Sequence, residues 1–253
     1  MENFIDLSNK AYIITGASSG IGRAVAQLAH KFGAKLLLLA RNKDALMETA
    51  KNMDSNKYIC ESIDLTNFDL IESVIDNAKE KIGKFNGFCH CAGVEQTLPI
   101  RSMNPQNYQN LFNINTIAGF ELARICSKKV YMSDDGSSFV FIASIMGIVG
   151  RPGLIGYSAS KGAVIAAVHS MALELAPKHI RVNLVSPGTI MTKMIENALK
   201  NMEEEQRNKR LNEYPLGFGT PEDIANIVLF LLSDRSKWIT GSNIIIDGGY
   251  TAK

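Results

Sequence analysis

Short apolar runs alternate along the chain with longer stretches of amphipathic pattern. The first two runs, residues 10–15 and 35–40, are almost uninterrupted, which is typical of strands buried on both faces of a sheet. The stretches that follow them, 23–32 and 43–53, repeat apolar positions with the period of a helix. This alternation predicts a parallel sheet with right-handed crossovers, a Rossmann-type doubly wound α/β fold with helices on both faces.

The same pattern continues to the end of the chain. We expect further strands at 57–63, 87–91, 137–144, 181–185 and 243–246, and further helices at 68–82, 105–132 and 157–176. A last helix is expected to begin at Thr220-Pro221, because threonine is favoured as an N-cap and proline in the first turn. No linker or repeat interrupts the pattern, so residues 1–253 are predicted to form a single domain.

Composition limits the classes of partner. The 27 basic and 25 acidic residues leave a formal charge of +2, and the longest charged cluster, residues 203–210, has mixed signs. We therefore expect no nucleic-acid or membrane partner. The start of the chain lacks a basic segment followed by a long apolar run, and no apolar run reaches membrane-spanning length. A cytoplasmic protein is expected.

The four cysteines have no spacing typical of a metal site or a disulfide framework. We interpret Cys60, Cys89, Cys91 and Cys126 as small buried hydrophobic residues, with Cys89 and Cys91 on opposite faces of a strand. No metal is predicted.

A glycine-rich turn, Gly16-Ala-Ser-Ser-Gly20-Ile-Gly22, stands between the first strand and the first helix. Glycines allow a close backbone approach to a pyrophosphate, while the amides of the helix start and the Ser18 and Ser19 hydroxyls can donate hydrogen bonds to it. The spacing differs from the commoner G-x-G-x-x-G, and an ordinary turn is the alternative.

The end of the second strand carries Arg41 and no carboxylate before Asp44. In dinucleotide-binding folds an acidic residue near this point binds the ribose 2′-hydroxyl, whereas arginine suits a 2′-phosphate. The sequence thus favours NADP(H) over NAD(H), which stays possible. The alternative is an arginine that only ends a strand in solvent.

Tyr157 and Lys161 lie four residues apart at the start of a predicted helix, so their side chains share one face. A nearby ammonium group lowers the pKa of a phenol, and a surface pair is the alternative interpretation. Ser144 lies at the carboxyl end of a predicted strand, where parallel sheets bind their ligands. Asn113 and Asn115 are polar residues within a helical pattern, where asparagines are more often structural than catalytic.

These separate features occur in one order along one chain, and together they closely resemble the short-chain dehydrogenase/reductase family in its single-domain branch. The resemblance covers essentially the whole chain. It rests on Thr15-Gly16-x3-Gly20-x-Gly22, Asp64, Ala92-Gly93, Asn115, Ser144, Tyr157-x3-Lys161, Asn183 and Pro187-Gly188. It implies one dinucleotide-binding and catalytic domain that interconverts a ketone and a secondary alcohol with a nicotinamide cofactor.

The resemblance also implies roles for four catalytic residues. Tyr157 would exchange a proton with the substrate oxygen, and Ser144 would hydrogen-bond the same oxygen. Lys161 would hold the nicotinamide ribose and lower the tyrosine pKa, and Asn115 would maintain a helix distortion and a water that feeds protons to Lys161. The implied cofactor contacts are Gly16, Ser18, Ser19, Ile21 and Gly22 at the pyrophosphate, Arg41 at the 2′-phosphate, Asp64 and Leu65 at the adenine, Ala92 and Gly93 at the adenosine ribose, and Tyr157, Lys161, Pro187, Gly188, Ile190 and Thr192 toward the nicotinamide.

Within the family, the chain is most similar to 3-oxoacyl-acyl-carrier-protein reductases, through Pro215-Leu216-Gly217 and residues 220–225. Lys178 suits an acidic carrier protein, but Asp134 and Asp135 would repel one. Residues 189–215, with a methionine-rich stretch at 191–202, would cover the substrate or pack as an ordinary helix. A sugar, polyol, steroid or small-alcohol dehydrogenase and a non-catalytic NADP(H)-binding scaffold or sensor are the alternatives. The resemblance further implies a homotetramer.

Overall fold

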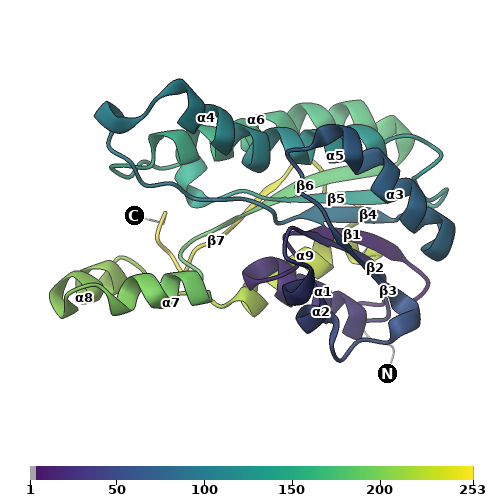
Figure 1. Cartoon of the computed structure of the whole chain (residues 1–253), viewed down its shortest axis with the longest axis horizontal. Helices are drawn as coiled ribbons and strands as arrows, with labels where there is room; N and C mark the ends of the chain where they lie inside the picture. Colours follow the sequence, from purple (N-terminus) through teal and green to yellow (C-terminus); the bar gives the residue numbers. More distant parts are fainter. Residues whose placement is uncertain (1–3, 253) are drawn as a thin grey trace.

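The computed structural model describes residues 4–252, apart from the side chains of Met194 and Ala198. Seven parallel strands form one sheet in the order β3-β2-β1-β4-β5-β6-β7 (Figure 1). The strands are β1 (Ala11–Thr15), β2 (Lys35–Ala40), β3 (Tyr58–Ser62), β4 (Gly87–His90), β5 (Ser137–Ile142), β6 (Ile180–Pro187) and β7 (Asn243–Ile246). The predicted doubly wound α/β fold is confirmed.

Helices cover both faces of the sheet (Figure 1). One face carries α3 (Phe68–Ile82), α4 (Pro105–Phe112), α5 (Ala118–Cys126) and α6 (Ile155–Leu175), and the other carries α1 (Gly20–Lys31), α2 (Lys43–Ala50) and α9 (Pro221–Leu232). Two further helices, α7 (Lys193–Lys200) and α8 (Glu204–Asn212), lie at one end of the molecule, beside the C-terminus. None of the helices formed by residues 4–252 is both long enough and apolar enough to cross a membrane.

Alternate residues of each strand supply two separate cores. In β2, Leu37 and Leu39 pack toward α3, α5 and α6, whereas Leu36 and Leu38 pack toward α1, α2 and α9. Both sides of the strand are fully buried, which explains why the strand appears in the sequence as an uninterrupted apolar run.

The strand order reverses between β1 and β4. From β1 the chain builds outward to β2 and β3, then crosses back to place β4 on the other side of β1. The carboxyl ends of these two strands therefore diverge into loops on opposite faces, which leaves a crevice at the switch point. The predicted glycine-rich turn and Ala92-Gly93 both follow these strand ends.

The helix predicted at 105–132 differs from the structure in two respects. It ends at Cys126, and it is interrupted by a π-helical turn, η3 (Asn113–Ile117), between α4 and α5. Residues 127–132 form turns that lead back toward the sheet, where the Tyr131 carbonyl accepts a hydrogen bond from the Phe85 amide. Their polar and apolar residues continue a helical pattern, so the pattern alone did not locate the end.

The prediction that Cys89 and Cys91 lie on opposite faces of a strand is also wrong. Their sulfur atoms lie 3.4 Å apart, because residues two positions apart in an extended chain point to the same side. Cys60, Cys89 and Cys126 are buried as predicted, and Cys91 is half-buried. The predicted domain limits, residues 1 and 253, lie outside the described residues.

Candidate active site

A cavity of about 620 Å³ lies at the switch point, and the glycine-rich turn forms one wall of it. Gly16 and Gly20 have φ angles of 64° and 51°, a region that side chains other than glycine disfavour. A Cβ atom on Gly22 would lie 2.3 Å from the Gly16 carbonyl oxygen, so the turn could not close around a larger residue. The amides at the start of α1 and the Ser18 and Ser19 side chains consequently border the cavity.

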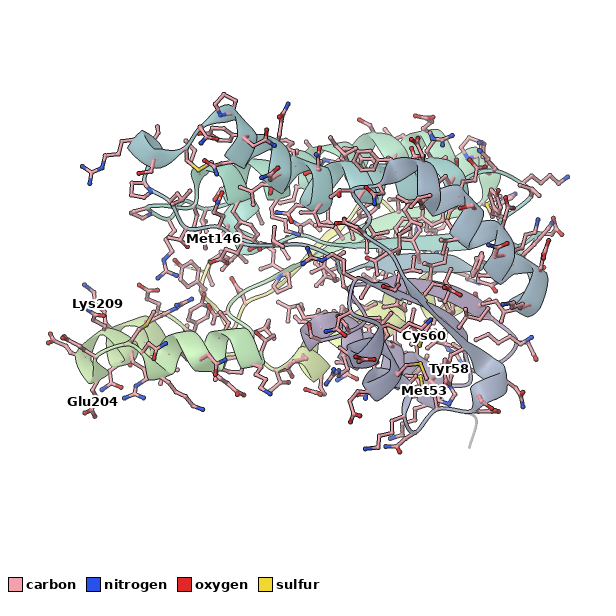
Figure 2. The ribbon with its side chains drawn as sticks, in the orientation of Figure 1. Met53, Tyr58, Cys60, Met146, Glu204 and Lys209 are labelled. Atoms are coloured by element: carbon pink, nitrogen blue, oxygen red, sulfur yellow. The ribbon has the colours of Figure 1, made fainter. Side chains whose placement is uncertain are left out.

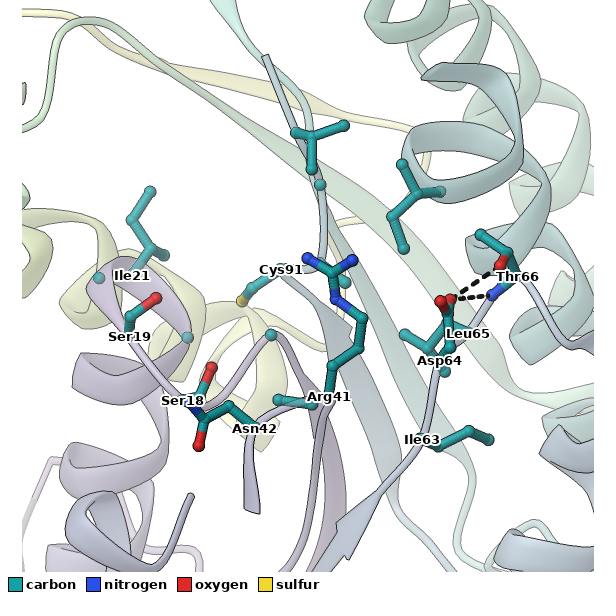
Figure 3. A pocket seen from close by; sticks show the side chains of 18 of the residues that line it. Ser18, Ser19, Ile21, Arg41, Asn42, Ile63, Asp64, Leu65, Thr66 and Cys91 are labelled. Carbon is teal, nitrogen blue, oxygen red and sulfur yellow. Dashed lines mark hydrogen bonds between the residues drawn. The ribbon is translucent and has the colours of Figure 1, made fainter. Parts of the chain in front are cut away.

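The opposite wall comes from the ends of β2 and β3. Figure 3 shows the Arg41 guanidinium between the glycine-rich turn and the segment that contains Asp64 and Leu65. The Asp64 carboxylate accepts hydrogen bonds from the Thr66 amide and hydroxyl at 2.9 and 2.8 Å, which hold its pKa below the usual range. Asp64 is therefore an anion fixed in place, and it lines the same cavity as Arg41.

A second cavity, of about 240 Å³, contains the other predicted residues, and we call it the inner cavity. Ser144, Tyr157 and Lys161 line it, together with Pro187, Gly188 and Ile190. Five residues line both cavities, and these are Ile21, Cys91, Gly93, Val94 and Thr192. The two spaces therefore adjoin, and between them they bring together every predicted site residue except Asn115.

The Tyr157 phenol is the group for which the sequence predicted a lowered pKa, and this prediction is wrong for the structure. Burial raises the pKa of Tyr157 to about 12, against a smaller lowering effect of a hydrogen bond with Ser144. Lys161 Nζ lies 6.0 Å from the centre of the tyrosine ring. Desolvation of the phenolate outweighs the attraction of an ammonium at that distance, so the phenol is protonated at neutral pH.

Lys161 is buried, with 5% of its surface exposed. Its ammonium donates a hydrogen bond of 2.8 Å to the Ile142 carbonyl at the end of β5. Burial disfavours the charged form and lowers its pKa to about 8. Lys161 is therefore mostly charged at pH 7 and loses its charge as the pH rises through about 8.

Asn115 lies in the π-helical turn, and its amide joins three segments. Its Oδ1 accepts from the Val94 amide at 2.8 Å, and its Nδ2 donates to the Val94 carbonyl at 2.9 Å and to Ser160 Oγ at 3.0 Å. The helix distortion that the family resemblance implied is therefore present. Asn115 connects the loop after β4 to α6, the helix that carries Tyr157 and Lys161.

Gly93 lies against the side chains of both Asn115 and Lys161. A Cβ atom at this position would be 3.1 Å from Asn115 Oδ1 and 3.4 Å from Lys161 Nζ. Only a residue without a side chain leaves the backbone open to the cavity here. Together with the glycine-rich turn, this open backbone fits a dinucleotide that extends across both cavities.

Several residues that line the two cavities were not assigned to the site from the sequence, and they include a thiol, two guanidiniums and a phenol. Cys91 lines both cavities, and Arg151, Arg210 and Tyr214 line the smaller one. Arg151 could have been noticed, because its loop runs from Ser144 to Tyr157. Nothing in the sequence marked Arg210 or Tyr214, because α8 has the residue pattern of a charged surface helix and Tyr214 lies just after it.

Metal ligands do not gather at the site. Residues 4–252 contain no group of three or more His, Cys, Asp or Glu side chains that could hold a metal ion. His90, beside Cys91, is buried, and desolvation lowers its pKa to about 3. Its Nδ1 lies 3.0 Å from Thr15 Oγ1, which also accepts a hydrogen bond from the Ala92 amide. A neutral histidine thus supports the loop that contains Ala92 and Gly93.

Comparison with known proteins gives a consistent result. Residues 16–251 match a family model described as enoyl-(acyl carrier protein) reductase. The chain is 37% identical to a 3-oxoacyl-[acyl-carrier-protein] reductase of Rickettsia felis, over 97% of this chain and 98% of the relative. It is 31% identical to an NAD-dependent glycerol dehydrogenase of Listeria innocua, over 98% and 96%.

A solved structure agrees with these sequence matches. A short-chain dehydrogenase/reductase from Brucella melitensis, titled a glucose/ribitol dehydrogenase, superposes with a TM-score of 0.90 at 30% identity, over 97% of this chain and 98% of that one. The chain therefore belongs to the short-chain dehydrogenase/reductase family, and it is a nicotinamide-dependent oxidoreductase acting on CH–OH groups.

Proposed function

We propose that this enzyme is an NADP(H)-dependent reductase that converts a 3-oxoacyl thioester to the 3-hydroxyacyl thioester. The observation that carries the proposal is the common cavity of Ser144, Tyr157 and Lys161, which adjoins the larger cavity lined by Arg41. The likeness to 3-oxoacyl-[acyl-carrier-protein] reductases supports this substrate class.

Tyr157 acts as the general acid in this proposal. Its raised pKa keeps the phenol protonated, so that it can donate a proton to the carbonyl oxygen of the substrate. Ser144 donates a hydrogen bond to the same oxygen and stabilises the negative charge that develops there. The nicotinamide, when bound, supplies the hydride. Asn115 joins the loop after β4 to α6, and Lys161 joins α6 to the end of β5, so that both hold the reacting groups in position.

Substitution of the proton donor tests the reaction. Tyr157→Phe should lower kcat for reduction of an acetoacetyl thioester by about 10²- to 10⁴-fold, while the dissociation constant for NADPH changes little. Ser144→Ala should also lower kcat. Unchanged thioester reduction by the Tyr157→Phe variant would refute the acid role.

Arg41 supports the preference for NADP(H). Its side chain borders the larger cavity, and the nearest acidic residue in sequence, Asp44, does not line that cavity. Arg41→Ala should raise the dissociation constant for NADPH about tenfold or more and leave that for NADH unchanged. Tighter binding of NADH than of NADPH by the unaltered protein would contradict the preference, and the NAD-dependent relative makes this a real alternative.

A small polyol or secondary alcohol is the second candidate substrate. The likeness to a glycerol dehydrogenase and the small volume of the inner cavity, about 240 Å³, both favour it. A panel of ketones and alcohols, assayed beside the thioester, separates the two. Turnover of the panel without the thioester would favour this alternative, and NADPH binding with no turnover at all would favour a cofactor-binding scaffold.

A carrier-protein partner has less support. Asp135 is exposed where an acidic partner would need a base, and Asp134 forms an ion pair of 3.0 Å with Lys84. Lys128 is paired with Glu72, which leaves Lys129 and Lys178 as the exposed bases nearby. We therefore propose that a small thioester is sufficient as substrate.

Residues 189–215 are proposed to cover the substrate. Ile195 of α7 and Arg210 of α8 both line the inner cavity, which supports a covering role over that of an ordinary surface helix. The homotetramer and the cytoplasmic location also stay predictions.

A further inference from the structure

We propose that the inner cavity binds an anionic group of the substrate, a carboxylate, sulfonate or phosphate attached to the reacting carbonyl compound, through Arg151 and Arg210. This inference rests on the proposed carbonyl reduction and narrows its substrate class. The source of the anion is either an acid group of the substrate itself or the phosphate of a pantetheine-type thioester.

The two arginines reach the cavity from different parts of the chain. Arg151 belongs to the loop between Ser144 and α6, and Arg210 belongs to the last turn of α8. Figure 2 shows Met146, which lines this cavity, below α4 and α6 in this view, and Lys209, the neighbour of Arg210, on α8 further down. The same cavity contains Ser144 and Tyr157, so an anion held there would be part of the reacting molecule.

Neither guanidinium has an acidic partner. Within residues 4–252, no carboxylate lies within ion-pair distance of Arg151 or Arg210, and neither side chain makes a hydrogen bond. Arg124 pairs with Glu121, and Arg181 donates to three carbonyl oxygens, whereas Arg41, Arg101 and Arg207 likewise form no ion pair or side-chain hydrogen bond within residues 4–252. Arg151 is itself exposed, so the distinguishing feature is that two unpaired guanidiniums line one small cavity.

Of the two arginines, Arg210 gives the stronger evidence for a bound anion. Its Nε atom is buried without a hydrogen-bond acceptor in the described residues, and a buried donor without a partner is unfavourable. Arg210 lies close enough to Tyr214 to lower the pKa of that phenol, although burial raises it overall. The Tyr214 hydroxyl is already engaged with Thr189 Oγ1 at 2.8 Å. An anion in the cavity would supply the acceptor that Arg210 lacks.

The charge of the side chains that line the inner cavity also favours an anion. Its charged side chains are Glu95, Arg151, Lys161 and Arg210. Lys161 is engaged with the Ile142 carbonyl, and the exposed Glu95 forms no ion pair within the described part of the chain. Two guanidiniums outweigh one carboxylate, so the lining attracts an anion and disfavours a cationic substrate. The planar guanidinium also suits bidentate binding of a carboxylate or phosphate.

Paired substrates that differ in one charge test the proposal. The carboxylate arm compares 4-oxopentanoate and 5-oxohexanoate with their methyl esters, and the phosphate arm compares acetoacetyl-4′-phosphopantetheine with acetoacetyl-pantetheine. We expect kcat/KM to favour the anionic member of at least one arm by about tenfold or more. Arg151→Gln and Arg210→Gln should each reduce the ratio of kcat/KM between the anionic and the neutral member, and the double variant should bring that ratio close to one.

Two control variants replace an arginine by glutamine in the same way, but at positions outside the cavity. Arg207→Gln removes an exposed arginine of α8 three residues before Arg210, and Arg101→Gln removes an exposed arginine that lines neither cavity. Both should keep the anionic advantage. A melting temperature equal to that of the unaltered protein shows that a variant is folded.

Two results would overturn the proposal: equal kcat/KM for anionic and neutral members in both arms, or an anionic advantage that survives in the double variant. Calorimetric titration of the oxo acids and thioesters into the protein with NADP⁺ separates this failure from that of the proposed function. Binding that needs both arginines, without turnover, would support the anion site and refute the reductase. Absence of both binding and turnover would refute both.

Discussion

Lys161 shows how a single buried charge connects stability with function. Its ammonium is almost fully enclosed and has one hydrogen bond, to a carbonyl oxygen. Burial without an anionic partner is unfavourable, which is why its pKa falls to about 8. Functional sites commonly retain such unfavourable groups at a cost in stability.

The pH dependence of unfolding should reveal this cost. The folded-state pKa, about 8, lies below the ordinary value of 10.5, so between these two values the unfolded chain binds more protons than the folded one. Stability therefore rises with pH across this window. Lys161→Met should be more stable than the unaltered protein at pH 7, by roughly 2–4 kcal/mol, and this difference should shrink toward pH 10.

Urea unfolding at pH 7, 8, 9 and 10 measures this difference. Groups other than Lys161 titrate in both proteins, so they cancel in the comparison. A difference that stays constant over the whole range would show that the buried ammonium is not the cause.

Gly93 permits a second test at the scale of one residue. Gly93→Ala adds a methyl group 3.1 Å from Asn115 Oδ1 and 3.4 Å from Lys161 Nζ, in backbone that borders both cavities. We expect the KM for the nicotinamide cofactor to rise about tenfold, because the added atom occupies space beside the proposed ribose site. Gly150→Ala is the control, since a Cβ atom there meets nothing within 4 Å. Equal kinetics for the two variants would contradict the assignment of the cavity.

At the scale of the element, α9 begins with a complete capping box. The Thr220 amide donates to Asp223 Oδ2 at 2.7 Å, and the Asp223 amide donates to Thr220 Oγ1 at 3.3 Å. Pro221 occupies the first turn, where its missing N–H has no cost. The helix then buries Ile224, Val228 and Leu229 against the sheet.

Removal of the cap should therefore weaken the helix without altering its position. Thr220→Ala should lower the free energy of unfolding by about 1 kcal/mol, because the amide and the carboxylate of Asp223 both lose their hydrogen bonds with the Thr220 hydroxyl. Thr220→Ser keeps the hydroxyl and should cost much less. Thermal or urea denaturation compares the three proteins, and equal loss in both variants would mean that the methyl group, not the hydroxyl, matters.

At the scale of the whole molecule, the features that the sequence predicted are those set by local chemistry. Leu36 to Leu39 are predicted as a buried strand because both faces of a parallel strand are covered. Ser144 and the glycine-rich turn could be assigned to one edge of the sheet, because parallel strands all end there.

The features it did not predict depend on contacts between distant segments. The Tyr157 pKa is set by how deeply the fold buries the phenol, and Arg210 belongs to the site only because α8 lies beside the inner cavity. The π-helical turn at Asn113–Ile117 could be expected only from the family resemblance, since a shift of one hydrogen bond leaves the residue pattern unchanged.

Large apolar side chains on the surface give the whole molecule a further expected property, association into a homotetramer. Trp238 is 97% exposed and Leu173 is 79% exposed. The segments that carry them meet, because a Cβ atom on Gly241 would lie 3.4 Å from the Cβ atom of Ala172. Large exposed apolar side chains on neighbouring segments are typical of a contact between proteins.

Light scattering at micromolar concentration should give about four times the mass of one chain, which is 27.7 kDa. Leu173→Glu should shift the protein toward smaller species, because a contact between copies would bury the introduced carboxylate. Leu70→Glu is the matched control, since Leu70 lies in α3 and is already 51% exposed. A monomeric unaltered protein would exclude the tetramer, and equal dissociation of both variants would mean that the contact lies elsewhere than at Leu173.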